Sequence, residues 1–159
     1  MTFKTADLVD AHDADLTFCD LPFLRFGRRR AFAGAMVTVK CFEDNALLKA
    51  TLQEPGRGRV LAVDGGGSTR CALMGDVIAE IMRSNGWAGA VIHGAIRDCE
   101  DIDAMDVGLR CLSTSPKKSG KDGFGHRDVE LRFGGAVFRP GEWLYCDADG
   151  VLLSRDKLL

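Results

Sequence analysis

Arg97 and Asp98 are neighbouring side chains whose chemistry suits a small anionic substrate. They come directly after residues 88–96, an almost unbroken apolar run that predicts a strand covered on both faces. In open α/β sheets, ligands bind beyond the carboxyl ends of the strands, which is where this pair is expected. A guanidinium can hold a carboxylate or an enolate oxygen through a bidentate hydrogen bond, and an aspartate offers a hard oxygen ligand to a divalent cation.

Residues 75–78 (Gly-Asp-Val-Ile) supply a second part of the same candidate site, because they begin a predicted helix over 75–85. The first N–H groups of a helix have no acceptor within the helix, so this end attracts a carboxylate or a phosphate. Together, an anion-binding helix end, an arginine and an aspartate are sufficient to form a binding site for a small keto acid. The spacing by itself is also compatible with an alternative, in which Arg97 and Asp98 form an ordinary surface ion pair.

The glycine-rich segment 64–68 (Asp-Gly-Gly-Gly-Ser) follows a predicted strand, as phosphate-binding loops do. It lacks the Lys-Ser or Lys-Thr pair of a P-loop, and the sequence contains no G-x-G-x-x-G. We therefore interpret these glycines as positions where the backbone passes close to other atoms. His93 lies inside the apolar run and is interpreted as a packing residue, and Trp87 as a packing anchor.

Alternating helices and strands are expected to position these groups in a single α/β domain spanning residues 1–159. From residue 116 onward, short strand patterns separated by Gly and Pro turns predict a β-meander, so the whole sheet is expected to be mixed. The predicted helices cover 5–12, 45–53, 75–85 and 100–106, and the predicted strands cover 35–42, 59–63, 88–96, 109–114, 129–133, 136–138, 143–147 and 151–154.

The composition of the 159 residues is that of a globular protein, with 46% apolar and 28% charged residues. The net charge of −2 argues against a nucleic-acid binder, so we interpret the basic triplet 28–30 as a solvated turn and expect no direct nucleic-acid binding. The six cysteines form no C-x-x-C pair and are interpreted as free thiols in a reducing compartment. No apolar run approaches the ~20 residues of a membrane span, so we expect a cytoplasmic protein without a membrane partner.

The spacing of the candidate residues resembles that of a known family. Asp76 is followed, after twenty intervening residues, by Arg97 and Asp98; the segment 64–68 precedes this pattern, and residues 85–87 (Asn-Gly-Trp) lie within it. This arrangement resembles the regulator of ribonuclease activity A (RraA-like) family, which includes the class II 4-hydroxy-4-methyl-2-oxoglutarate aldolases. The resemblance covers nearly the whole chain, from residue 5 to residue 153.

The resemblance implies a layered β/β/α fold like that of swivelling domains, assembled as a homotrimer with its sites at subunit boundaries. It implies that Arg97 binds the substrate and stabilises negative charge, and that Asp98 holds a metal, Mg²⁺ or Mn²⁺, largely through waters. Asp76 is expected to act in catalysis together with Asp101, both orienting water or groups around the metal. The implied substrate-binding residues are Gly75, Asp76, Val77, Ile78 and Arg97.

The activity implied by this resemblance is that of a divalent-metal-dependent lyase. Such an enzyme cleaves 4-hydroxy-4-methyl-2-oxoglutarate to pyruvate and decarboxylates oxaloacetate, and both small 2-oxo acids yield a pyruvate enolate that the metal and Arg97 stabilise. Family members with robust aldolase activity carry an acidic residue on a C-terminal extension. Residues 155–159 contain no counterpart, so we expect decarboxylation to be the stronger activity. The family also implies an alternative, a non-catalytic protein that binds and inhibits ribonuclease E.

Overall fold

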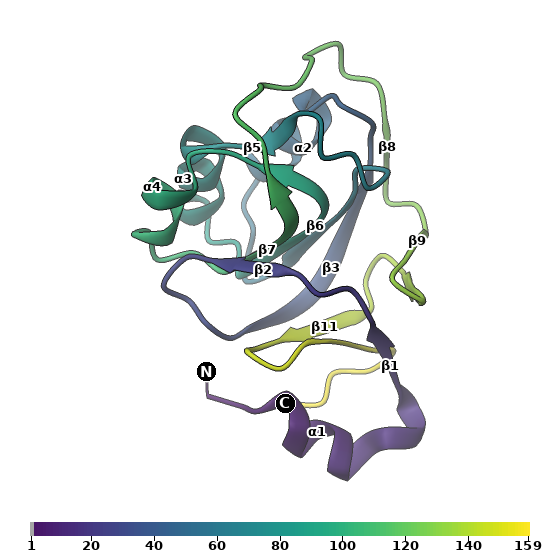
Figure 1. Cartoon of the computed structure of the whole chain (residues 1–159). Coiled ribbons are helices and arrows are strands. Elements are labelled where there is room, and N and C mark those ends of the chain that lie inside the picture. Colours follow the sequence, from purple (N-terminus) through teal and green to yellow (C-terminus); the bar gives the residue numbers. More distant parts are fainter. Residues whose placement is uncertain (1) are drawn as a thin grey trace.

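The computed structural model describes residues 2–159, which form short helices and strands arranged around a large sheet (Figure 1). The helices are α1 (Thr5–His12), the 3₁₀ helix η1 (Asp13–Asp15), α2 (Ala46–Leu52), α3 (Asp76–Ser84) and α4 (Cys99–Asp103). The strands are β1 (Leu16–Cys19), β2 (Leu24–Phe26), β3 (Phe32–Lys40), β4 (Val60–Asp64), β5 (Ala72–Met74), β6 (Gly89–Ile96), β7 (Leu109–Thr114), β8 (His126–Arg127), β9 (Leu131–Phe133), β10 (Ala136–Phe138), β11 (Trp143–Cys146) and β12 (Val151–Ser154).

The large sheet has ten strands and is mixed, as predicted. Its main path runs β1-β12-β11-β3-β4-β6-β7-β2, while β5 pairs with β6 and β8 pairs with β3. The central pairs β3–β4, β4–β6 and β6–β7 are parallel. The pairs toward both edges are antiparallel.

The C-terminal strands form two hairpins that belong to different sheets. Strands β9 and β10 pair only with each other, whereas β11 and β12 join the large sheet beside β3. The predicted meander is therefore divided between two layers. Strands β1, β2, β5 and β8 were not predicted, because each contains only two to four residues and two of them lie at sheet edges.

Alternating residues of the central strands pack into two separate apolar clusters. In β4, Leu61 and Val63 join the cluster under α2, α3 and α4, whereas Val60 and Ala62 join the cluster beneath β9 and β10. All four side chains are fully buried. This two-sided burial explains why such strands are apolar throughout, and it produces the layers of helices, sheet and β-hairpin that the β/β/α prediction describes.

Helix α3 has an apolar face and a clear stop signal in the sequence. Its buried face carries Ile78, Ala79 and Met82. Its end is formed by Gly86, whose φ of 75° lets the Trp87 N–H donate back to the Met82 carbonyl over 3.2 Å. A side chain at this φ would be strained, so Gly86 fixes the point where the chain turns into β6.

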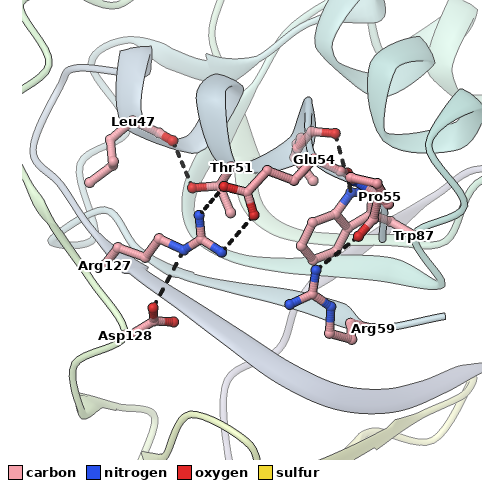
Figure 2. Close-up of polar contacts among 9 residues, drawn as sticks. Leu47, Thr51, Glu54, Pro55, Arg59, Trp87, Arg127 and Asp128 are labelled. Carbon is pink, nitrogen blue, oxygen red and sulfur yellow. Dashed lines mark hydrogen bonds and ion pairs between the residues drawn. The ribbon is translucent and has the colours of Figure 1, made fainter. Parts of the chain in front are cut away.

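Trp87 joins the end of α2 to the sheet and is nearly fully buried, as the packing interpretation predicted. Its indole N–H donates to the carbonyls of Leu52 and Glu54, at 3.2 and 3.1 Å, and the Arg59 guanidinium lies 5.0 Å from the ring centre (Figure 2). Glu54 also accepts two hydrogen bonds, of 2.6 and 2.9 Å, from Arg127 (Figure 2). These contacts fix the C-terminal end of α2 against β4 and β8.

At the far end of the molecule from α3 and α4, α1 packs against β11 and β12 (Figure 1). The small cluster between them contains Leu8, Leu16, Tyr145 and Leu152, all buried. Within residues 2–159 no helix combines the length and apolar character needed to cross a membrane.

Candidate active site

The short strand β5 places the start of α3 beside Arg97. It runs parallel to β6, and the Arg97 N–H donates to the Met74 carbonyl over 2.9 Å. Because Met74 and Ile96 are partners across these two strands, Gly75 and Arg97 follow equivalent positions at the same edge of the sheet. The structure therefore brings residues 75–78 and the Arg97–Asp98 pair together at the carboxyl ends of parallel strands.

The Asp98 carboxylate contacts both its neighbour and the helix start. Its Oδ2 lies 3.9 Å from the Arg97 Nε and accepts a hydrogen bond of 3.2 Å from the Asp76 N–H. Asp98 has a φ of 55°, a left-handed conformation that turns its side chain back toward α3. The Arg97 and Asp98 side chains are 41% and 36% exposed, so the pair remains accessible to a ligand.

Gly75 is the position that permits this close approach. A Cβ added there would lie 2.7 Å from the Asp98 Oδ2 and 3.4 Å from the Arg97 Cγ. The φ of −121° at Gly75 is open to any residue, so the requirement for glycine is a matter of space and not of backbone conformation.

These groups line one cavity of about 460 Å³. The cavity contains every predicted substrate-binding residue, together with Asp98, whereas Asp101 is exposed on α4 and does not line it. Several lining residues were missed by the sequence reasoning: Asn45, Lys49 and Gln53 from α2 and its flanks, and Lys118 and Lys121 from the loop after β7. The spacing of four residues between Asn45, Lys49 and Gln53 is a signal that could have found the first group.

Lysines give the cavity a cationic character. Lys49, Lys118 and Lys121 join Arg97 in its lining, facing the two carboxylates Asp76 and Asp98. None of the three lysines lies within 4.0 Å of a carboxylate among residues 2–159. Positive charge left without a local partner favours an anionic ligand that carries more than one negative group.

The loop that carries Lys118 and Lys121 is held by the buried carboxylate of Asp44. Asp44 accepts hydrogen bonds from the N–H groups of Ala46, Asp122 and Gly123. Burial alone would raise the pKa of Asp44, but these backbone donors lower it below the ordinary value of 3.8. One carboxylate thus fixes both the start of α2 and the loop on opposite sides of the cavity.

We expect Asp44→Asn to destabilise the protein by about 2 kcal/mol near pH 7, because the charge-assisted hydrogen bonds weaken. Since the pKa of Asp44 is lowered by folding, its contribution is complete above the pKa of the unfolded chain and is lost as the pH falls through the folded value. Urea unfolding of both proteins from pH 7 to pH 3 measures this. The difference in free energy of unfolding between the two proteins should be constant near neutral pH and should shrink below about pH 4. An unchanged difference at pH 3 would contradict this stabilising role of the Asp44 carboxylate.

The cavity fits an open divalent-cation site rather than a closed cage. Within residues 2–159 no group of three or more His, Cys, Asp or Glu side chains is arranged to hold a metal ion. Mg²⁺ commonly uses only one or two protein carboxylates and fills its other positions with waters and substrate oxygens. Asp98, partly exposed at the cavity and hydrogen-bonded through Oδ2, is suited to this mode of binding.

Three solved structures resemble this chain in sequence and fold. A Geobacillus kaustophilus protein described as S-adenosylmethionine:2-dimethylmenaquinone methyltransferase is 47% identical, with a TM-score of 0.97 over 98% of this chain and 97% of that one. The RNA-processing inhibitor RraA from Thermus thermophilus is 43% identical, with a TM-score of 0.96 over 100% and 96%. Streptomyces coelicolor RraAS2, described as an unusual member of the RNase ES inhibitor RraA protein family, is 26% identical, with a TM-score of 0.76 over 94% and 78%.

These relatives carry names that describe different activities, so they establish the family and the fold but not what this chain does. The family model described as RraA-like, Aldolase/RraA, matches residues 5–153. That range includes all of the large sheet except Ser154 at the end of β12, helices α1 to α4 and every residue that lines the cavity. From this match and from the two relatives above 40% identity, the chain belongs to the RraA-like family.

Proposed function

We propose that the protein is a divalent-cation-dependent carbon–carbon lyase acting on small 2-oxo dicarboxylic acids, with Asp98 as the protein ligand of Mg²⁺ or Mn²⁺. The observation that carries this proposal is the single cavity in which Arg97, Asp98 and the start of α3 meet three lysines. A cation held there supplies Lewis-acid stabilisation of the negative charge that develops on the 2-oxo oxygen.

Different groups of the chain bind the two carboxylates of the substrate. The start of α3 and the Arg97 guanidinium favour the carboxylate next to the 2-oxo group. The Ile78 N–H has no hydrogen-bond acceptor among residues 2–159, so it is free to bind that carboxylate. Lys49, Lys118 and Lys121 are placed to attract the second, distal carboxylate of the substrate.

Both candidate reactions break the bond between C3 and C4 of the substrate. In 4-hydroxy-4-methyl-2-oxoglutarate, the C4 hydroxyl loses its proton to a water molecule, C4 becomes the carbonyl carbon of one pyruvate, and the bonding electrons remain on C3 as the enolate of a second pyruvate. In oxaloacetate, C4 leaves as CO₂ and the same enolate remains. Arg97 stabilises the enolate oxygen in both cases, and protonation at C3 completes pyruvate. Decarboxylation requires no residue to accept a hydroxyl proton, so it makes the smaller demand on the site.

We also propose that the protein forms a homotrimer with its cavity at a subunit boundary, as the family resemblance implies. Two exposed apolar side chains support such an interface. Val77 lines the cavity and is 63% exposed, and Phe124, which belongs to the loop that carries Lys118 and Lys121, is 77% exposed.

The proposal is tested by measuring pyruvate release from oxaloacetate with and without Mg²⁺ or Mn²⁺. We expect the protein-dependent rate to disappear with EDTA and to return when either cation is added in excess. Because free divalent cations decarboxylate oxaloacetate slowly by themselves, the control is the same cation without protein. A protein-dependent rate that is unaffected by EDTA, or no rate above the control, would contradict the proposed activity.

Gly75→Ala is expected to lower this activity at least tenfold while leaving stability nearly unchanged. The added methyl group would displace the Asp98 carboxylate, which lies 2.7 Å from the position of that Cβ, without straining the backbone. A displacement of about 1 Å in an active site can cost up to a hundredfold in rate. Gly150→Ala is the matched control, because no atom lies within 4 Å of its added Cβ. Equal activities for the two variants would refute this role of Gly75.

A second candidate function is the binding and inhibition of ribonuclease E. It is supported by the 43% identical relative described as an RNA-processing inhibitor and by the more distant member of the RNase ES inhibitor family. A ribonuclease E pull-down that survives Arg97→Ala would favour this candidate over a role confined to the cavity.

A further inference from the structure

The start of α3 is occupied by carboxylates that belong to the protein itself. The Asp76 N–H donates to the Asp98 Oδ2 over 3.2 Å, and the Val77 N–H donates to the Asp76 Oδ1 over 2.8 Å. Of the N–H groups in this first turn, that of Ile78 is left without an acceptor among residues 2–159. The position that should attract a substrate carboxylate is therefore partly filled.

The contact between Asp98 and the helix is fixed by the backbone on both sides. Asp98 adopts a left-handed φ of 55°, and its carbonyl accepts the first hydrogen bond of α4, from the Ile102 N–H over 3.0 Å. On the opposite side, Gly75 leaves the space that the carboxylate occupies. The Asp98 side chain is thus held at the mouth of α3 by two elements that meet there.

We propose that Asp98 acts as an internal competitor of the substrate carboxylate until a divalent cation engages it. The inference rests on the proposed function, since it assumes that Asp98 is the cation ligand. In the cation-free protein, Asp98 holds the Asp76 N–H and presents negative charge to an arriving carboxylate. When Asp98 turns to a cation, this N–H becomes available, so cation and oxo acid bind with positive coupling.

This competition predicts opposite effects of one substitution under two conditions. Removing the Asp98 carboxylate should abolish cation-dependent binding of an oxo acid but strengthen its binding in the absence of cation. A residue that served only as a metal ligand would have no effect on cation-free binding beyond the loss of its charge. The side-chain amide of Asp98→Asn can still accept from the Asp76 N–H, whereas Asp98→Ala cannot. Comparing Asp98→Asn with Asp98→Ala therefore separates the effect of losing the negative charge from the effect of losing the hydrogen bond.

The experiment is a titration of the 159-residue chain with oxalate, a dianion related in shape to the pyruvate enolate, observed through the backbone amide signals of residues 76–78. In EDTA we expect Asp98→Ala to bind oxalate about tenfold more tightly than wild type, the effect of one charge-assisted hydrogen bond, and Asp98→Asn to gain clearly less. In wild type, Mg²⁺ alone should shift the Asp76 amide signal. Saturating Mg²⁺ should tighten oxalate binding, and oxalate should tighten Mg²⁺ binding by the same factor. Thermal unfolding verifies that both variants are folded.

The outcomes separate this inference from the proposed function. If Asp98→Ala binds oxalate no more tightly than wild type in EDTA, or if Asp98→Asn and Asp98→Ala gain equally, the contact is not a competitor and the inference is wrong while the lyase proposal stands. If Mg²⁺ binds but the Asp76 amide signal does not change, the inference is also wrong. If no protein binds oxalate or Mg²⁺ under any condition, the proposed function fails and this inference fails with it.

Discussion

Replacing Arg97 with lysine is expected to lower kcat for oxaloacetate decarboxylation by about a hundredfold, the usual loss when one donor to a developing oxyanion is removed. Arg97 is placed for this role because it lines the cavity beside the start of α3 and lies 3.9 Å from Asp98. Lysine keeps the positive charge but loses the planar fork that can hold two oxygens together. We expect Arg97→Ala to lose about tenfold more than Arg97→Lys, since the charge is then lost as well.

The measurement is steady-state pyruvate release at saturating Mg²⁺, with Arg70→Lys as the matched control. Arg70 is exposed and does not line the cavity, so its replacement should leave kcat unchanged. If Arg97→Lys retains the wild-type kcat, or if Arg70→Lys loses as much as Arg97→Lys, Arg97 does not stabilise the enolate.

The second large effect is expected from Asp98→Asn, which should abolish the stimulation of activity by Mg²⁺ and lower the rate by about a thousandfold. Metal ions contribute several kcal/mol to the stabilisation of developing charge, and each 1.4 kcal/mol corresponds to about a factor of ten in rate. The amide of asparagine is nearly the same size as the carboxylate, so the cavity keeps its shape while the cation loses its charged ligand.

Binding of Mn²⁺, followed by electron paramagnetic resonance, should decline in Asp98→Asn in parallel with the rate. Asp101→Asn is measured beside it as a separate test, because Asp101 is exposed on α4 outside the cavity although the family resemblance implied a role for it around the metal. A large loss in Asp101→Asn would support that role. Unchanged Mn²⁺ binding in Asp98→Asn would exclude Asp98 as the cation ligand.

The central part of the fold could be predicted because its signals are local. Residues 88–96 are apolar except for His93, and the structure places β6 there with both faces buried. Helix α3 was predicted within one residue at each end, because Gly86 supplies an unambiguous stop signal. The sequence also grouped residues 75–78 with Arg97 and Asp98, because a helix start and the carboxyl end of a buried strand both favour an anionic ligand.

The remainder of the site depends on contacts between distant segments, which a single sequence does not display. Strand β5 has only three residues, and it is recognisable as a strand only through its pairing with β6. Lys118 and Lys121 reach the cavity because Asp44, more than seventy residues earlier, holds their loop. The contact between the Asp98 carboxylate and the Asp76 N–H likewise depends on the left-handed backbone conformation of Asp98, which no sequence pattern predicts.

The attachment of the lysine loop to one buried carboxylate separates the cavity into two parts with different origins. Gly75, Arg97 and Asp98 lie directly after strands β5 and β6, at the starts of α3 and α4, whereas Lys118 and Lys121 lie on a segment held by Asp44. We therefore expect that loop residues 117–121 can be exchanged, with Asp44 and its partners retained, so that the proposed lyase accepts a neutral or aromatic distal group in place of a carboxylate. Under that proposal the groups that break the bond and the groups that select the substrate lie on separate segments, which makes the loop a starting point for redirecting the proposed activity toward new oxo acids.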